Sequence, residues 1–509
     1  MTTTEPPDQP WLSGLSTTQR QVATCVDGPQ LVTAGPGSGK TRTLCAWIVE
    51  LLRAAQVASE DILAVTFTRR AARELSERLH QLLGAQTEQL LIGTFHRLAL
   101  RLAPLPPSLH VVEEPTRLAL IEQATIGSGS RKSPTSLLSL LSLRKGQHPD
   151  FDQRLQSGEL SVSDEELQVF RHYTAQLREL GLCDLDDLLL RALHVIEAGT
   201  AQRQFRFIAV DEYQDISATQ RALVVALGRT ATVLAIGDPD QAIYSFRGGE
   251  IRHFLGFCDD FPSAQSRYLV ENYRSTPQIV AASAAVIGPN PGRTAPPPEP
   301  KLPSGSPLHI LRCPSQRSEA QRIVHEIERL VGGTSLLSHD SRQTSSWRAG
   351  SYGFSDLAIL TRSVARADAI AQALSDAGLP FSRPSLARQK AGHTTVESIE
   401  PLYECDELED QRIAVLTLHG AKGLEFTVVF LVGLEAGQLP GPGRSDEERA
   451  EERRLFYVGM TRAKELLYLS WNESAESMPS PFLREIPSEL VSSEEKVKRR
   501  TPKPQLRLF

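Results

Sequence analysis

Short apolar runs of strand length recur along the first part of the chain, and stretches with apolar residues at helical spacing follow them. The runs lie at residues 31–34, 61–68 and 89–94, and the helical spacing covers 42–52 and 69–83. Short runs that are apolar throughout are typical of parallel strands buried on both faces. The pattern therefore predicts an α/β fold in which helices flank a parallel sheet.

Two further apolar runs, 207–211 and 232–238, end in acidic or Gly-Asp residues. Parallel α/β sheets place ligands at the carboxyl ends of their strands, so these acidic residues are expected at a ligand site. We predict that residues 1–96 and 204–275 form one α/β domain that contains all five runs.

The segment between the two parts of this domain has a different pattern. Helical spacing dominates residues 97–203, with little sign of strands. The clearest helical stretches are 137–143, 165–180 and 185–197. We therefore predict an inserted helical domain over 97–203 that interrupts the sheet.

The chain changes character after the first domain. A stretch rich in proline and glycine, 288–307, cannot continue a helix or a central strand and predicts a linker. A second α/β domain is predicted at 276–471, two polar stretches at 332–355 and 384–411 as loops, and 472–509 as a disordered basic tail. The expected strands of this domain are 308–312, 356–361, 413–418 and 427–433, and its expected helices are 318–330 and 365–377.

Composition narrows the class of protein without naming a substrate. The net charge is −6 and the sequence pI is about 6.1, so a groove for nucleic acid has to be built locally. The 6 cysteines include no Cys-x-x-Cys pair, which argues against a zinc site or a disulfide framework and favours a reducing compartment. Residues 1–10 lack the apolar core of a signal peptide, and no run approaches the length of a membrane span. A cytoplasmic protein without membrane contact is expected.

Residues 35–41 read Gly-Pro-Gly-Ser-Gly-Lys-Thr and lie between the first apolar run and the first helical stretch. This is a P-loop in its required context. Backbone N–H groups of such a loop surround phosphate, Lys40 neutralises phosphate charge, and the Thr41 hydroxyl ligates Mg²⁺. The expected ATP-binding residues here are Gly35, Pro36, Gly37, Ser38, Gly39, Lys40, Thr41 and Arg42.

Two later segments supply further chemistry. The sequence Val-Asp-Glu-Tyr-Gln-Asp at 210–215 places Asp211 to hold Mg²⁺ and Glu212 to orient and deprotonate an attacking water. In the segment 237–249, Gln241 is expected near the γ-phosphate or its water. In the same segment, Tyr244 and Phe246 offer stacking faces to unpaired bases. The chain is therefore predicted to hydrolyse ATP rather than only bind it.

Together with six more segments, these motifs resemble the UvrD/Rep/PcrA family of superfamily 1A DNA helicases across residues 15–470. The six segments are 15–20, 66–68, 93–96, 269–276, 417–426 and 451–463. The resemblance implies two RecA-like P-loop domains with parallel sheets flanked by helices, called 1A and 2A. It also implies that the helical insertion is the family's 1B domain.

The resemblance assigns further contacts with ATP. It implies that Gln19 reads the adenine edge and that Tyr273 stacks on the adenine. Glu425 is expected toward the ribose. Arg274 and Arg462 are expected to reach the γ-phosphate from opposite sides. An arginine can hold the γ-phosphate in this way only while ATP is intact.

The resemblance also assigns contacts with DNA, at Phe67, Thr94, His96 and His419. Two features depart from the family. Phe246 stands where tryptophan is common, which keeps an aromatic face of smaller area. Only 145 residues separate Arg274 from His419, which leaves no room for the family's mobile 2B domain and makes 384–411 its expected remnant.

The leading hypothesis is an ATP-dependent 3′→5′ translocase and helicase that acts on single-stranded DNA and on junctions with duplex. Its expected place is the cytoplasm at the nucleoid, in DNA repair or replication. A second hypothesis is a translocase that displaces proteins with little unwinding, because the duplex-gripping domain is missing. A third is a helicase-like ATPase subunit of a nuclease or anti-phage assembly.

The chain ends Gln505-Leu506-Arg507-Leu508-Phe509 after a polar, basic stretch. Terminal apolar residues with no adjoining core contribute nothing to folding. The pentapeptide resembles the bacterial sliding-clamp-binding motif, in which Gln505, Leu506, Leu508 and Phe509 would be the docking residues. A chance apolar end that folds back on the protein is the alternative. On the resemblance to the clamp-binding motif, the tail is predicted to tether the protein to a clamp.

Overall fold

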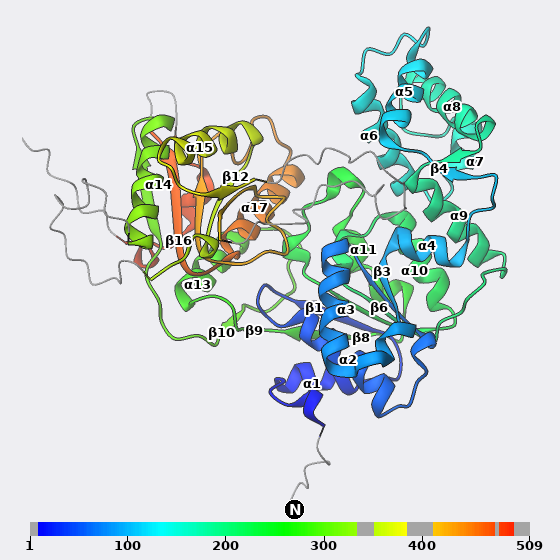
Figure 1. The fold of residues 1–509 in the computed structure, drawn as a ribbon, viewed down its shortest axis with the longest axis horizontal. Helices are drawn as coiled ribbons and strands as arrows, with labels where there is room; N and C mark the ends of the chain where they lie inside the picture. Colours follow the sequence, from blue (N-terminus) through cyan, green and yellow to red (C-terminus); the bar gives the residue numbers. More distant parts are fainter. Residues whose placement is uncertain (1–8, 333–350, 384–410, 474–477, 493–509) are drawn as a thin grey trace, which may run out of the picture.

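The computed structural model describes residues 9–332, 351–383, 411–473 and 478–492. Its first domain is built on a six-stranded parallel sheet with the order β3-β2-β6-β7-β1-β8 (Figure 1). The strands are β1 Gln30–Ala34, β2 Ile62–Thr66, β3 Leu91–Thr94, β6 Phe207–Val210, β7 Thr232–Gly237 and β8 Gln265–Leu269. Each of the five predicted apolar runs overlaps one of these strands. The α/β fold predicted for this region is confirmed.

The observed strands are shorter than the predicted runs because polar residues at the run ends leave the sheet. Thr68, for example, caps helix α3 (Arg69–Leu83), where its side chain accepts a hydrogen bond from Ala71 N. Strand β8 was not predicted, because its first residues are polar and exposed on the edge of the sheet. An edge strand needs no apolar pattern on its open side.

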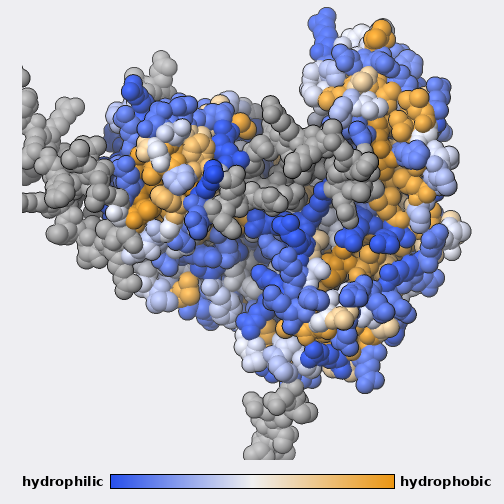
Figure 2. All heavy atoms as spheres, viewed as in Figure 1, coloured by the Kyte–Doolittle hydropathy of each residue, from blue (hydrophilic) through white to orange (hydrophobic). Residues whose placement is uncertain are grey.

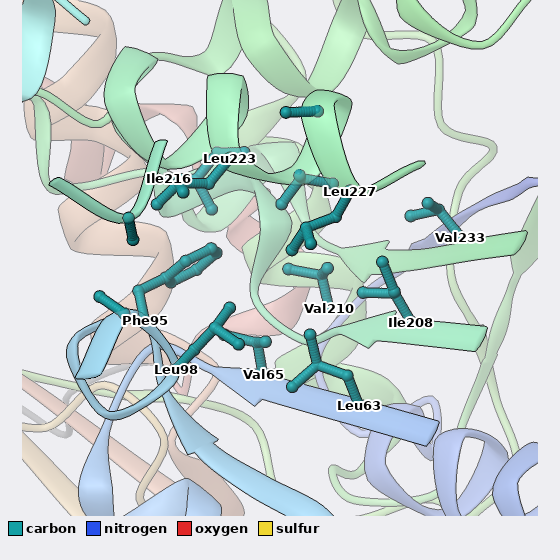
Figure 3. Packing of buried hydrophobic residues seen from close by; sticks show 14 of the residues in the cluster. Leu63, Val65, Phe95, Leu98, Ile208, Val210, Ile216, Leu223, Leu227 and Val233 are labelled. Carbon is teal, nitrogen blue, oxygen red and sulfur yellow. The ribbon is translucent and has the colours of Figure 1, made fainter. Parts of the chain in front are cut away.

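Helices cover both faces of the first sheet. On one face lie α2 (Lys40–Arg53) and α3, whose apolar residues pack with Val32, Ala64 and Ile236 in one core. On the other face lie helices α4, α9 and α10, and Figure 3 shows part of that second core. Their bounds, with those of the remaining helices of the domain, are α1 Thr17–Thr24, α4 Phe95–Leu102, α9 Leu185–Glu197, α10 Ala218–Gly228, α11 Ile251–Leu255 and α12 Phe257–Asp260.

The helical insertion forms a separate lobe beside the first sheet (Figure 1). It contains α5 Glu114–Thr125, α6 Pro134–Gln147, α7 Phe151–Ser157 and α8 Asp164–Glu179, with a short parallel pair of β4 His110–Val111 and β5 Leu182–Cys183. These helices share a core of their own. Helices α4 and α9, which lie within the predicted insertion, instead pack mainly on the first sheet. They connect the lobe to the first domain.

The second domain is a second six-stranded parallel sheet with the order β11-β16-β15-β12-β14-β13. Its strands are β11 His309–Cys313, β12 Leu357–Thr361, β13 Phe381–Ser382, β14 Ile413–Thr417, β15 Phe426–Val432 and β16 Ala463–Asn472. Its helices are α13 Pro277–Ile287, α14 Gln316–Val331, α15 Val364–Asp376 and α17 Asp446–Met460. A short pair, β9 Glu271–Asn272 with β10 Glu299–Pro300, holds the linker between the domains. The second predicted sheet is thus confirmed.

The prediction of a disordered tail over 472–509 is wrong for its first part. Residues 478–492 pack on the second domain, where the Phe482 side chain is 1% exposed in the core. Val491 forms a bridge with Leu308, and Ser492 N donates to Leu308 O at 2.8 Å. The apolar residues of this segment are scattered among polar ones, so no periodic pattern indicates that the segment packs on the domain. The terminal pentapeptide lies outside the described residues.

Figure 2 shows that hydrophilic residues cover much of one face, with an extended hydrophobic area over the helical lobe. Within the described ranges, no helix is both long and apolar enough to cross a membrane. The loop predicted at 332–355 lies mostly outside the described residues, and the remnant predicted at 384–411 lies almost wholly outside them.

Candidate nucleotide and strand-binding sites

The P-loop connects β1 to α2, as its sequence predicts. Gly37 and Gly39 have φ angles of +69° and +83°, which side chains with a Cβ rarely adopt. A Cβ on Gly37 would lie 2.5 Å from Arg274 Cβ, and one on Gly39 would lie 2.5 Å from Gln19 Nε2. Lys40 Nζ donates to Ala34 O at 2.8 Å. The glycines therefore let the loop pack closely against Arg274 and Gln19, in the backbone conformation that a phosphate-binding loop requires.

Gln19 lies against the P-loop at the start of α1. Its Oε1 accepts from Ser16 N at 2.9 Å, which completes a capping box, and its Nε2 donates to Ser38 O at 2.8 Å. An amide nitrogen carries two hydrogens, so Nε2 keeps one for another acceptor. Arg42 lies further out, where its Nη2 donates to Ser13 O at 2.8 Å. The structure thus places Gln19, the predicted adenine contact, beside the P-loop.

Asp211 and Glu212 follow β6 and face the P-loop lysine. Burial, and then the charge of Glu212, raise the pKa of Asp211 to about 7. Burial also acts to raise the pKa of Glu212, but the charges of Lys40 and Lys422 outweigh it and lower that pKa. The two carboxyls therefore suit different roles. Asp211, whose charge is disfavoured by burial, would be stabilised by a divalent cation, and the ionised Glu212 suits a general base.

Backbone geometry holds this acidic pair in place. Asp211 Oδ1 accepts from Glu212 N at 2.9 Å, and Glu212 has a φ of +51°, a strained value for a residue with a side chain. Gln214 Nε2 donates to Glu212 Oε2 at 2.5 Å, and Gln214 Oε1 accepts from Asp238 N at 2.9 Å. Such backbone strain is typical of functional sites.

Arg462 follows α17 in the second domain and is 2% exposed. Its guanidinium donates to four neutral oxygens, which are Val458 O at 3.0 Å, Leu424 O at 3.1 Å, Gln241 Oε1 at 2.9 Å and Thr461 Oγ1 at 3.3 Å. Burial, and then the charge of Arg274, lower the pKa of Arg462 to about 9. A buried cation whose bonds go to neutral oxygens is well suited to receive an anion.

Arg274 joins the P-loop to the second domain. Its Nε lies 2.8 Å from Glu425 Oε2, and its Nη1 donates to Thr461 O at 3.2 Å. Lys464 also pairs with Glu425, at 2.8 Å. The neighbouring Tyr273 has an exposed ring, and its N donates to Gly37 O at 2.9 Å. The residues predicted for ATP therefore converge on the P-loop from both domains.

An aromatic cluster lies across the domain boundary. Phe67 and Tyr244 stack with their ring centroids 5.1 Å apart, and Phe246 meets Tyr244 at 5.9 Å and His419 at 5.5 Å. Phe246 is 55% exposed, although aromatic rings are usually buried. The structure thus brings together four predicted DNA contacts, three from the first domain and His419 from the second.

Thr94 and His96 lie at the carboxyl end of β3. The register pairs Thr94 with Thr66, the residue before Phe67, so this strand end lies beside the cluster. The Thr94 hydroxyl accepts from Arg97 N at 3.4 Å and caps α4, while His96 is half-buried in the first turn of α4. Thr94 is therefore a helix cap as well as a predicted DNA contact.

Lys422 lies in the segment 417–426, and no role was predicted for it from the sequence. Its Nζ donates to Gln241 O at 2.7 Å and to Asp215 Oδ2, and lies 4.9 Å above the Tyr244 ring. Lys422 belongs to the second domain, and its three partners belong to the first. The only signal in the sequence was the presence of Asp215 and Lys422 in two separate motifs, which does not indicate that they pair.

Comparison with known proteins gives two family matches. Residues 15–262 match the UvrD/REP helicase N-terminal domain, and residues 267–385 and 394–474 match the UvrD-like helicase C-terminal domain. The protein called ATP-dependent DNA helicase PcrA in Staphylococcus aureus is 26% identical, with 98% of this chain and 90% of the relative covered. The protein of the same name in Staphylococcus epidermidis is 25% identical, with 97% and 89% covered.

The alignment with the Staphylococcus aureus relative runs over 673 positions, whereas this chain has 509 residues. The relative therefore has residues opposite gaps in this chain at 164 positions or more (673 − 509). The C-terminal family match breaks between residues 385 and 394, inside the segment predicted as a remnant.

Proposed function

Because the chain belongs to the UvrD/REP helicase family, we propose that it is an ATP-dependent DNA helicase that translocates 3′→5′ along single-stranded DNA. The convergence of both domains on one P-loop, next to an aromatic cluster that also spans both domains, carries this proposal. ATP is the proposed substrate, with Mg²⁺ as cofactor. The direction of movement follows from the family resemblance.

In the proposed mechanism, Lys40 and the P-loop amides hold the phosphates, and Gln19, Tyr273 and Glu425 hold the adenosine. Thr41 and Asp211 would ligate Mg²⁺, which would neutralise charge on the phosphates. Glu212 orients the attacking water and takes its proton. Gln241 Oε1 accepts from Arg462 at 2.9 Å, so Gln241 both faces this site and positions an arginine.

Hydrolysis would be coupled to movement through the domain boundary. Arg462 comes from the second domain and Arg274 from the linker that leads to it, and both grip the γ-phosphate only while it is bonded. Loss of the γ-phosphate removes these contacts and loosens the second domain, which carries His419 and Lys422. The aromatic cluster then changes shape, and stacked bases pass from one pocket to the next.

The proposal is tested by measuring ATP hydrolysis with and without single-stranded DNA, and then unwinding of duplexes with a 3′ or a 5′ tail. We expect DNA to stimulate hydrolysis and only the 3′-tailed duplex to open. Equal opening of both duplexes would contradict the direction, and hydrolysis indifferent to DNA would contradict the proposal itself.

A second candidate activity is displacement of bound protein with little unwinding. The gaps in this chain opposite the Staphylococcus aureus relative favour this second activity, because the relative's residues at those positions are numerous enough to form a domain. Streptavidin displacement from a biotinylated single strand, compared with strand separation by the same preparation, distinguishes the two activities. Release of streptavidin without strand separation would favour the second candidate.

Alanine at Phe67 or Phe246 is expected to weaken single-strand binding by about 1–3 kcal/mol for each stacked base that is lost. Hydrolysis without DNA should hardly change, because both rings belong to the aromatic cluster and neither is proposed to bind ATP. Fluorescence anisotropy with labelled oligo-dT measures the affinity. Leu255→Ala, which removes another exposed apolar side chain of the first domain, is the control. Loss of basal hydrolysis in the phenylalanine variants would instead indicate core residues.

The terminal peptide is proposed to bind the bacterial sliding clamp at micromolar strength, as is usual for a short segment that orders on binding. The double substitution Leu508→Ala with Phe509→Ala should abolish clamp binding and leave DNA-stimulated hydrolysis intact. Surface plasmon resonance with immobilised clamp measures this. Equal binding by the doubly substituted protein would refute the proposal.

A further inference from the structure

A buried lysine lies where the helical lobe meets the first domain. Lys145, near the end of α6, is 1% exposed. Its Nζ donates to Asp184 Oδ2 at 2.7 Å and to Asp187 Oδ1 at 2.5 Å. Burial disfavours the charged amine, but the two carboxylates outweigh it and raise the pKa of Lys145 above its ordinary value. The charged lysine therefore links α6 to the helix that carries the two carboxylates.

The two carboxylates belong to the first turn of α9. Asp184 Oδ1 accepts from Asp187 N at 3.0 Å, and Asp187 Oδ2 accepts from Asp184 N at 2.9 Å, so the pair also caps the helix. Helix α9 contributes Leu189 and Leu193 to the core of the first sheet and Leu190 to the core of the lobe. The lysine thus connects α6 to the helix that both cores share.

The end of α6 also contacts the first domain directly. Thr219 of α10 donates its hydroxyl to Lys145 O at 2.7 Å, in a buried position. Two residues earlier, Leu143 O and Leu143 Cδ1 each lie 3.7 Å from the point where Gly248 would carry a Cβ. Gly248 ends the short turn Ser245–Arg247, which presents the exposed ring of Phe246. Helix α6 therefore abuts the turn that carries a proposed DNA contact.

We propose that Lys145 is a positioning residue that holds α6 against the 245–249 turn and so sets the affinity of Phe246 for single-stranded DNA. The inference rests on the proposed strand binding at Phe246. Removing one partner of a buried ion pair leaves the other unpaired and lets the connected helices separate. A loosened α6 would release the turn, because Leu143 would no longer support Gly248.

The test compares Lys145→Met with the parent chain by two readouts. Amide hydrogen exchange without DNA should become faster at Gly248 and Gly249, whose N–H groups bond to Ser245 O and Tyr244 O. Affinity for labelled oligo-dT should fall about tenfold, as for the loss of one stacked base, while hydrolysis without DNA stays unchanged. Phe246→Ala added to Lys145→Met should weaken binding little further, because both changes remove one contact.

A matched control breaks a buried ion pair elsewhere. Glu319 is 0% exposed and pairs with Arg366 at 2.7 Å in the second domain, away from the turn. Glu319→Gln should lower the unfolding temperature without faster exchange at Gly248 or weaker DNA binding. If Lys145→Met does not fold, Lys145→Met with Asp187→Asn removes one charge of each sign and takes its place.

The outcomes separate the inference from the proposed function. Unchanged exchange at the turn in the folded variant would overturn the inference, as would fully additive losses with Phe246→Ala. Faster exchange with unchanged DNA affinity would also overturn it. If the parent chain itself does not bind oligo-dT, the proposed function fails, and the role of Lys145 in DNA affinity fails with it. The exchange result then shows only whether Lys145 holds the turn.

Discussion

Glu212→Gln should bind ATP almost as well as the parent chain yet hydrolyse it about 10²–10⁴-fold more slowly, the usual loss for a removed general base. The glutamine keeps the size of the side chain and its acceptor for Gln214 but cannot take a proton from water. The structure supports the role because the charges of Lys40 and Lys422 lower the pKa of Glu212 despite its burial. A general base must be ionised before it can accept a proton, and these charges favour the ionised form.

Lys40→Ala should also abolish hydrolysis, but by weakening the binding of nucleotide with Mg²⁺. Binding of a fluorescent ATP analogue and steady-state phosphate release, measured together, distinguish the two variants. Asp61→Asn is a suitable control, since it removes a carboxylate of the same domain that pairs with Arg206 at its surface. Near-full turnover by Glu212→Gln would show that another group activates the water.

Local patterns predicted the elements of the fold well. The helix predicted at 69–83 has those bounds in the structure, because apolar positions at helical spacing and the Thr68 cap agree with each other. Nine of the twelve strands that the structure describes in the two sheets lie within or close to the predicted runs, since a strand buried on both faces must be apolar throughout. Strands β13 and β16 of the second sheet were not predicted. Strand β8 escaped prediction because its open edge tolerates polar residues.

Contacts between distant segments were not predictable in the same way. The packing of Phe482 on the second domain depends on core residues that only the folded domain brings together. The bonds from Lys422 to Asp215 and Gln241 join the two domains, and no local periodicity encodes such a partner. The resemblance to a family indicated which motifs meet, whereas the structure shows through which atoms they meet.

Arg462→Ala is expected to lower the rate of ATP hydrolysis by about 10³–10⁵-fold, the range for a lost arginine that stabilises charge in phosphoryl transfer. Four bonds to neutral oxygens hold this guanidinium in place, so no free energy is spent on reorienting it during the reaction. Arg462→Lys should restore little, because an ammonium cannot make the four bonds of the planar guanidinium. ATP affinity should fall much less than the rate.

Single-turnover hydrolysis and nucleotide binding, measured on the same preparation, check this expectation. Arg453→Ala is the matched control, because Arg453 lies in α17, nine positions before Arg462, and pairs with Glu485 at 2.7 Å instead of facing the P-loop. The control should hydrolyse ATP at the parent rate. If Arg462→Ala and Arg453→Ala lost the same modest activity, Arg462 would be a structural cation of the domain boundary. A loss confined to Arg462→Ala places the second domain in the hydrolysis step, which is the coupling that a stepping motor requires.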